Sequence, residues 1–463
     1  MKRSLFPLLF ALCSFFALNN TAWAAESGAL RVGAAKVDIT PTESELPKQY
    51  LGILDKIYSR AIVIDNGTTS AALITMDVIL VPDPDWERLS KRIEAELGIP
   101  AANILIAPTG THSVPYQRDA AGKAPSAAFE MGTAYDDRVL KSVRLAKERL
   151  QPARMSYGTG VSYINIQRDM IDANTRHWWE GANYDGISDK TVAVVKFESL
   201  GGEPIAVYYN YGVFNVITGT LDMVSGDITG AASRYIEDSF DDKVVAVLSA
   251  GAHGDQNPIY FQQTYDLREI RIRDYAKRGQ DISNAMPPGG EGLDRHDPAV
   301  ARLMNQQKQM ILSMGQMLGE EVLHVMRGAN RTVSTVQIYA KQKVVTCPGR
   351  ERTNEGRGGI AGTYKDGPPI DIRLGLLMIG DVAVGSVNAG VYSEIAQRLK
   401  KESPYAKTMM TTATNGLSNS FYIPDDASFG HETFEVLSSR LKPGCAETAI
   451  VNGIIDMMPA ITY

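Results

Sequence analysis

The stretch ILIAPTGTHS at residues 104–113 decides the fold class. Its first half, 104–108, is short and apolar, which is typical of a strand buried inside a sheet. Its second half, 109–113, is polar and places hydroxyl groups and the imidazole of His112 directly after the expected strand. Ligands in open α/β folds gather at the carboxyl ends of the strands. The stretch therefore predicts an α/β protein with a site at one edge of its sheet.

Similar apolar runs recur along the chain and alternate with helical segments. Runs rich in β-branched residues predict strands at 30–39, 61–65, 71–81, 192–197, 205–209, 244–249, 333–345 and 382–387. Helical spacing predicts helices at 86–97 and 298–327, the second with Asp297 as its N-cap, Pro298 at its first position and Gly328 as its stop. The alternation predicts an α/β fold in which helices pack on mixed sheets and long loops form the cleft.

Two stretches, 259–297 and 348–369, interrupt this alternation. Both are longer than most loops of a compact domain, so we expect them to form walls of the site. The second stretch contains Arg350, Arg352 and Arg357, which favours an anionic substrate. An exposed loop without a function explains the same composition.

Composition and charge exclude several classes of protein. Of 463 residues, 44% are apolar and 22% are charged, values that are usual for a soluble globular protein. Lys and Arg number 47 against 53 Asp and Glu, a formal net charge of −6. The chain therefore lacks the compositional signs of disorder and the basic excess of a general nucleic-acid binder.

The first residues have the pattern of a secretory signal peptide. Lys2 and Arg3 are followed by an apolar run at 5–18 that is too short to span a bilayer, and then by a small-residue cleavage site ending at Ala24. We expect residues 1–24 to be removed and 25–463 to form one exported domain, periplasmic or secreted, with no later transmembrane segment. An uncleaved anchor is the alternative.

Cys347 and Cys445 remain after the expected cleavage. An oxidising compartment permits a disulfide between them, and two separate buried thiols are equally compatible with the sequence.

Polar clusters follow the apolar runs at four places, 109–113, 224–227, 251–258 and 415–424. An imidazole in such a cluster can act as a general base or donate to an oxyanion, and a neighbouring carboxylate raises its basicity. A structural interpretation stands beside each one, because loop and helix caps use the same residues. The candidate catalytic residues are His112, Asp227, His253, Asp255 and Tyr422.

Two adjacent tryptophans mark a further polar segment, 176–181. Aromatic side chains in an exposed loop can stack on a sugar or another flat ligand, whereas buried ones are ordinary core. A carboxylate pair such as Glu180 with Asp227 is the minimum for glycosidic chemistry. The candidate substrate-binding residues are Arg168, His177, Trp178, Trp179 and Arg350.

These segments together resemble the neutral/alkaline non-lysosomal ceramidase family. The resemblance runs from about residue 30 to 450 and rests on a combination of motifs: the opening RVGAAKVDITP at 31–41, Thr-x-Thr-His-Ser at 109–113, Ser-Gly-Asp at 225–227, Gly-Asp-x-Asn-Pro at 254–258 and Tyr-Ile-Pro at 422–424. It implies the N-terminal domain of a zinc amidase that hydrolyses N-acyl sphingoid bases, without the family's C-terminal immunoglobulin-like domain.

The family's zinc ligands, two His, one Glu and one Tyr, are not all carried over. Where the family has its first His, its second His and its Glu, this sequence has Gly110, Phe214 and Gly390; Tyr422 matches the fourth ligand. Glycine and phenylalanine supply no side-chain donor for zinc. We therefore expect no family metal site, and zinc only if ligands have relocated, for example to His112, His253 and His431 with Asp227 or Asp255.

Three functions follow from the sequence. The first is an exported hydrolase on a ceramidase-like scaffold that works without the family zinc on an amide, an ester or a glycoside. The second is a catalytically inactive protein that binds a small molecule, lipid or carbohydrate in the same pocket. The third is a zinc-dependent ceramidase whose motifs align differently.

Overall fold

The structure is a computed structural model that describes residues 26–115, 133–283, 286–287, 289–356 and 358–460. The expected leader at 1–24 lies outside the described residues. None of the helices in the described ranges is long and apolar enough to cross a membrane.

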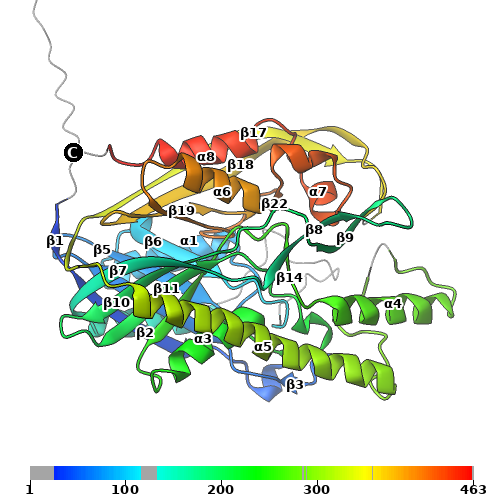
Figure 1. The fold of residues 1–463 in the computed structure, drawn as a ribbon, viewed down its shortest axis with the longest axis horizontal. Coiled ribbons are helices and arrows are strands. Elements are labelled where there is room, and N and C mark those ends of the chain that lie inside the picture. The colour runs from blue at the N-terminus through cyan, green and yellow to red at the C-terminus, as the bar shows by residue number, and fades with distance from the viewer. Residues whose placement is uncertain (1–25, 116–132, 284–285, 288, 357, 461–463) are drawn as a thin grey trace, which may run out of the picture.

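A large mixed sheet forms the centre of the molecule (Figure 1). Neighbouring strands are antiparallel except at two places, where β11 pairs with β13 and β5 with β6 in parallel. Strand β15 (Thr332–Val333) pairs with β7 beside the main path. In spatial order the strands are β13 (Val245–Ala250), β11 (Pro204–Tyr211), β10 (Thr191–Ser199), β7 (Gln151–Val161), β2 (Arg31–Asp38), β4 (Tyr58–Asp65), β5 (Ser70–Met76) and β6 (Ile104–Pro108).

A second sheet packs face to face on the first and gives the molecule four layers, helix, sheet, sheet, helix (Figure 1). It consists of β17 (Ile338–Arg352), β18 (Tyr364–Ile379), β19 (Val382–Val387) and β21 (Lys407–Thr411). Helices α1 (Asp83–Leu97), α2 (Thr133–Glu148), α3 (Asp227–Asp238) and α5 (Pro298–Gly328) cover the outer face of the large sheet. Helices α6 (Ser393–Glu402) and α8 (Ala446–Ile455) cover the outer face of the small one.

The sequence produces this layering because strand side chains alternate between two faces. In β4, Ile62 and Ile64 enter the core between the sheets, whereas Ala61 and Val63 pack against the helices. Both faces are apolar, so the strands read as continuous apolar runs. The prediction of mixed sheets with packed helices is confirmed.

Smaller elements surround the carboxyl ends of β11 and β13. A three-stranded sheet joins β14 (Gln256–Pro258), β8 (Asn165–Ile171) and β9 (Trp178–Asn183), and α7 (Phe434–Ser438) lies nearby. Short strand pairs on this side are β20 (Gly390–Val391) with β22 (Tyr422–Ile423) and β3 (Gly52–Ile53) with β12 (Met223–Val224). The pair of β1 (Gly28–Ala29) with β16 (Thr335–Val336) lies on the opposite side of the molecule (Figure 1).

Three local predictions were wrong. The expected loop 259–297 contains α4 (Gln262–Ala276), whose sequence has no apolar stripe because it buries only Leu267 and Arg271. Most of 348–369 belongs to the paired strands β17 and β18, so that the connection is only 353–363. The tryptophan pair lies in strand β9 instead of a loop.

The long helix is confirmed with its cap, because the Asp297 side chain accepts hydrogen bonds from two backbone amides at the start of α5. Gly328 is the last helical residue and not a residue beyond the helix. Cys347 and Cys445 form a disulfide with a Cα separation of 5.8 Å.

Candidate functional site

Backbone hydrogen bonds join the polar clusters at the strand ends. The His112 amide donates to the carbonyl of Asn215, at 3.0 Å, which ties the loop after β6 to the loop after β11. The Thr412 amide donates to Ala250 at 2.8 Å, which ties the end of β21 to the end of β13. Gly390 pairs with Tyr422 across β20 and β22. Segments about 300 residues apart in sequence therefore meet at one edge of the sheets, as the strand-end argument predicts.

The Phe214 ring lies among the candidate side chains from these loops. Its centroid is 4.7 Å from the His253 ring, 6.3 Å from His112 and 6.3 Å from Tyr422. The guanidinium carbon of Arg168 lies 4.4 Å from the Phe214 centroid and 5.8 Å from that of Tyr422. Phe214, His253 and Arg168 are only 4–5% exposed. The structure thus brings together four of the predicted site residues around an apolar ring.

Both histidines are held through Nδ1. His253 Nδ1 lies 2.8 Å from the carbonyl of Gly251, and His112 Nδ1 lies 3.0 Å from that of Gly110. A carbonyl can only accept, so these contacts assign the proton to Nδ1 and leave a lone pair on Nε2. Burial, with a smaller effect of the positive charge of Arg168, lowers the pKa of His253 to about 4. The same causes lower the pKa of His112. Both rings are therefore neutral near pH 7.

Arg168 carries a fixed positive charge into this cluster. Its Nη2 donates to the Gly254 carbonyl at 2.7 Å and pairs with Glu435 Oε1 at 2.5 Å. Burial alone would lower the pKa of Arg168, but the surrounding acidic groups, Glu435 foremost, together outweigh it and the pKa is raised. Burial raises the pKa of Tyr422 to about 12, so its hydroxyl stays protonated and can donate a hydrogen bond.

Asp255 is buried but does not pair with His253. One carboxylate oxygen accepts from the Ser393 amide at 2.9 Å, and the other accepts from the Ser393 hydroxyl and from Gln167. Burial raises its pKa to about 7. Because Ser393 begins α6, Asp255 fixes that helix end next to the site.

Asp227 is likewise engaged with its neighbours. Its Oδ2 accepts from the amide and the hydroxyl of Thr218, and its Oδ1 accepts from the Ile228 amide. Burial raises its pKa to about 6. It is the first residue of α3, with the left-handed φ of 54°, and Gly226 occupies the cap position that the sequence suggested for Asp227.

The predicted substrate-binding residues are spread over two places. Trp178 stacks on His431 with ring centroids 3.8 Å apart, and Trp179 lies under the Arg268 guanidinium. His177 precedes them and is exposed. Arg350 is elsewhere: it donates to the carbonyls of Ser439 and Val436, so it braces the backbone after α7.

A pocket of about 960 Å³ opens beside His112. His112 is exposed to this pocket although protein surrounds the rest of its ring, which is why the side chain is both accessible and largely desolvated. Apolar side chains from several loops form much of the wall, among them Ile79, Leu80, Val114, Met223 and Leu293.

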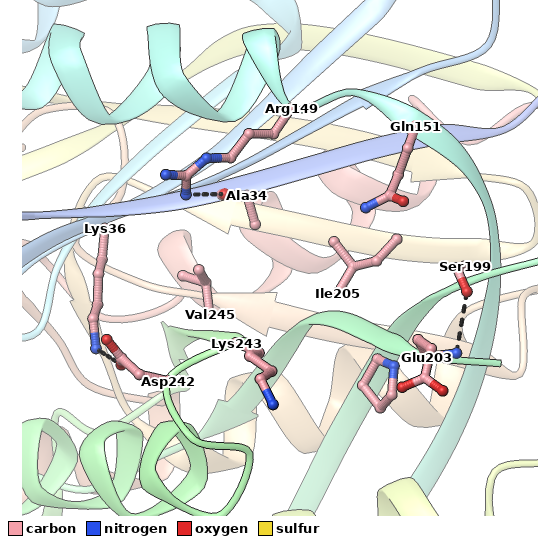
Figure 2. A pocket seen from close by; sticks show the side chains of 11 residues that line it. Ala34, Lys36, Arg149, Gln151, Ser199, Glu203, Ile205, Asp242, Lys243 and Val245 are labelled. Carbon is pink, nitrogen blue, oxygen red and sulfur yellow. Dashed lines mark hydrogen bonds and ion pairs between the residues drawn. The ribbon is translucent and has the colours of Figure 1, made fainter. Parts of the chain in front are cut away.

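Figure 2 shows a second cavity, of about 390 Å³, at the opposite ends of β11 and β13. Its cations are already engaged: Lys36 pairs with Asp242, and Arg149 donates to the carbonyl of Ala34. None of the predicted site residues lines it.

The side chains at the family's ligand positions do not fit a zinc ion. Phe214 presents an aromatic ring, and Gly110 has no side chain and a φ of 76°. A Cβ at Gly390 would lie 2.9 Å from the Phe421 ring, so a longer side chain there requires that ring to move. In the described part of the chain, no three His, Cys, Asp or Glu side chains are grouped so that they could hold a metal ion. Zinc in proteins needs three or four such donors.

Two residues near the centre were missed by the sequence analysis. Glu435 pairs with Arg168, and Asp169 accepts hydrogen bonds from His431 and Tyr392. Neither follows a buried apolar strand, the feature on which the predicted catalytic residues rest. Asp169 is next to Arg168 in the chain, but no spacing in the sequence joins Asp169 to His431 or Glu435 to Arg168.

Two neutral imidazoles, a guanidinium and a phenol thus meet at the strand ends, and His112 lines the neighbouring pocket. Residues 31–375 match the family described as neutral/alkaline non-lysosomal ceramidase, N-terminal. That match covers more than half of the chain, so the chain belongs to this family.

Known relatives and solved structures agree with the family. The neutral ceramidase of Pseudomonas aeruginosa is 27% identical over 306 residues, 60% of this chain and 45% of that protein. Neutral ceramidase A of Dictyostelium discoideum is 30% identical over 29% of this chain and 20% of its own length. This chain thus aligns with less than half of either relative. The crystal structure of the Pseudomonas aeruginosa neutral ceramidase shares the fold, with a TM-score of 0.65 and 17% identity over 93% of this chain and 74% of that one. A ceramidase complexed with C2 gives a TM-score of 0.68, 16% identity and the same coverage.

Proposed function

We propose that this protein hydrolyses the amide or ester bond of a lipid-like acyl substrate without the family zinc. The observation that carries the proposal is the position of His112, a neutral imidazole with a lone pair on Nε2 at the edge of a pocket whose walls are partly apolar. Apolar walls favour an acyl chain, and a base of this kind activates water. The names of the relatives support an acylated lipid as the substrate class.

The proposed reaction uses the chain's own groups. Nε2 of His112 takes a proton from water while the water oxygen bonds to the carbonyl carbon. Arg168 and the protonated Tyr422 stabilise the negative charge that forms on the carbonyl oxygen. The carbon–nitrogen or carbon–oxygen bond then breaks, and the leaving atom receives a proton, which yields a carboxylic acid and an amine or an alcohol.

The test compares chelated and untreated protein on two probes, p-nitrophenyl dodecanoate and N-dodecanoylethanolamine. We expect turnover that a chelator does not change. His112→Asn, which keeps a donor near the Nδ1 position, should lower kcat/KM by about 10²- to 10⁴-fold. His324→Asn, on the exposed side of α5, is the matched control and should leave kcat/KM unchanged. Turnover that the chelator abolishes would replace this proposal with a zinc-dependent ceramidase.

A second candidate is a binding protein without turnover. It is favoured by one observation: Phe214, His253 and Arg168 are almost fully buried, so protein already fills the centre of the site. Binding of N-dodecanoylethanolamine, measured by calorimetry, with no product from either probe would support it. The glycosidic alternative is less favoured, because both carboxylate oxygens of Asp227 are engaged by Thr218 and Ile228.

We propose export as the setting of this activity. The pattern of residues 1–24 and the disulfide between Cys347 and Cys445 support an oxidising compartment. Cell fractionation with mass spectrometry of the mature N-terminus tests it; we expect a start at Ala25, and a cytosolic chain that retains residues 1–24 would contradict it.

A further inference from the structure

We infer that Asp169 and His431 form a proton-transfer pair, in which His431 delivers the proton to the leaving group. This role rests on the hydrolysis proposed above, which assigns His112 to the water but no residue to the leaving atom.

The pair has the geometry of an imidazole oriented by a carboxylate. His431 Nδ1 lies 2.9 Å from Asp169 Oδ2, and the hydroxyl of Tyr392 donates to the same oxygen at 3.0 Å. Asp169 is 1% exposed, whereas the side chain of His431 is 23% exposed. The carboxylate is therefore shielded from water while the imidazole reaches the surface of the site. A buried carboxylate in this position fixes the tautomer and the orientation of the ring.

The ring of His431 is also fixed in its plane. It stacks on Trp178 with centroids 3.8 Å apart and an interplanar angle of 23°. Nδ1 is occupied by Asp169, so Nε2 is the nitrogen available for proton transfer. Among the described residues, no hydrogen bond engages Nε2. The ring of His431 is therefore held by two contacts, with Asp169 and with Trp178, while its second nitrogen stays open. A simple surface ion pair does not require both contacts.

Arg168 connects this pair to the rest of the site. Arg168 and Asp169 are consecutive residues of β8, and Arg168 pairs with Glu435 at 2.5 Å, four residues after His431. The other side of the Arg168 guanidinium faces Phe214, next to His112. The Arg168 guanidinium, the group that we assign to the developing oxyanion, thus contacts Phe214 on the His112 side and Glu435 on the side of the segment that carries His431.

The two imidazoles have different surroundings. His112 is neutral and has a lone pair on Nε2, whereas Nδ1 of His431 is held by a buried carboxylate. In the second half of the reaction, Nε2 of His431 releases its proton to the leaving nitrogen or oxygen as the bond to the carbonyl carbon breaks. The proton that His112 took from water returns through solvent to His431, so the cycle consumes only water and substrate.

A comparison of leaving groups tests this role. His431→Asn keeps an amide donor for Asp169 and removes Nε2, and His324→Asn is the matched control. The p-nitrophenolate of the first probe leaves without a proton, whereas the amine of N-dodecanoylethanolamine needs one. We expect His431→Asn to lower kcat/KM by 10²-fold or more on the amide and by less than about 5-fold on the ester. Added imidazole should restore part of the amide activity of His431→Ala.

The other outcomes are decisive as well. Equal losses on both probes, or no loss on either, would overturn the role of His431 and leave the proposed hydrolase intact. If wild-type protein turned over neither probe, the proposed function would fail, and this role would fail with it.

A chemical probe that needs no turnover tests the pair itself. Diethyl pyrocarbonate modifies unprotonated imidazole nitrogens, and peptide mass spectrometry resolves each histidine. We expect His431 to react at least 10-fold faster than the buried His253, and Asp169→Asn to slow it severalfold. A His431 that reacts no faster than His253 would overturn the inference, because Nε2 would not be accessible.

Discussion

The buried imidazole of His253 predicts a specific loss of stability in acid. Burial lowers its pKa from 6.5 to about 4 in the folded chain. The unfolded chain therefore binds the proton more readily, so the stabilisation is complete above pH 6.5 and is lost as the pH falls toward 4. The difference between 6.5 and about 4 corresponds to roughly 3 kcal/mol in full, most of which is lost by pH 4.5.

A variant isolates this contribution from other groups. The pKa of Asp255 is raised to about 7 and that of Asp227 to about 6, both by burial, so these carboxyl groups stabilise the fold as the pH falls and oppose His253. His253→Asn removes the titrating ring but keeps an amide donor for the Gly251 carbonyl, and the carboxyl groups stay in both proteins.

The assay is urea unfolding of both proteins at pH 7.5 and pH 4.5. We expect His253→Asn to be less stable than wild type at pH 7.5 and this difference in unfolding free energy to shrink by roughly 2 to 3 kcal/mol at pH 4.5. With an m value of roughly 3 kcal/mol/M, the difference between midpoints changes by roughly 0.8 M. An identical gap at both pH values would refute the argument that burial holds His253 neutral.

Three further predictions concern the disulfide, the central ring and the metal. Replacing Cys347 and Cys445 by Ser opens a bridge between residues 98 positions apart, which should cost about 4–5 kcal/mol in the loop-entropy estimate; an unchanged urea midpoint would speak against the bridge. Phe214→Leu removes the contact with the Arg168 guanidinium and part of a buried ring, so we expect the free energy of unfolding, measured by thermal unfolding, to fall by about 1–3 kcal/mol. An unchanged stability would mean that the Phe214 ring does not stabilise the site. Elemental mass spectrometry of protein purified without chelator should find well below one zinc per chain, and a stoichiometric value would contradict the proposed metal-free reaction.

Much of the fold was predictable because it depends on local patterns. Strands β6 and β19 occupy the predicted residues, and α5 begins at the predicted cap, since apolar runs and capping residues act over a few positions. Helix α4 was not predicted because its charged sequence has no apolar face that would indicate a helix. The segment with the two tryptophans was predicted to be a loop because β9 lies in a small, partly exposed sheet and its sequence has no apolar run.

The site was predictable only as a set of separate residues. His112, His253 and Tyr422 were chosen because they follow strands, but that they share one cluster depends on the pairing of β6, β11, β13 and β21 across hundreds of residues. The sequence alone left the pairing of Cys347 with Cys445 undecided for the same reason, because only the fold brings their Cα atoms to a separation of 5.8 Å. Asp169 and Glu435 gain their roles through contacts with His431 and Arg168, which no spacing in the sequence records.

Each of the three residues that the resemblance aligns with the family's zinc ligands fits its own surroundings. The Phe214 ring lies edge-on to His253, and the Arg168 guanidinium lies against it. A Cβ at Gly390 would lie 2.9 Å from the Phe421 ring, and Gly110 adopts a backbone angle that other residues avoid. Restoring a glutamate at 390 alone would displace Phe421, and restoring a histidine at 214 alone would leave two ligands missing.

Loss of a metal site without compensation would leave a polar cavity and unpaired donors, which are costly inside a protein. Here an aromatic ring occupies the centre, a paired guanidinium supplies a fixed positive charge, and both neighbouring imidazoles are hydrogen-bonded. This arrangement of the described residues is why we expect turnover by proton transfer without the family zinc.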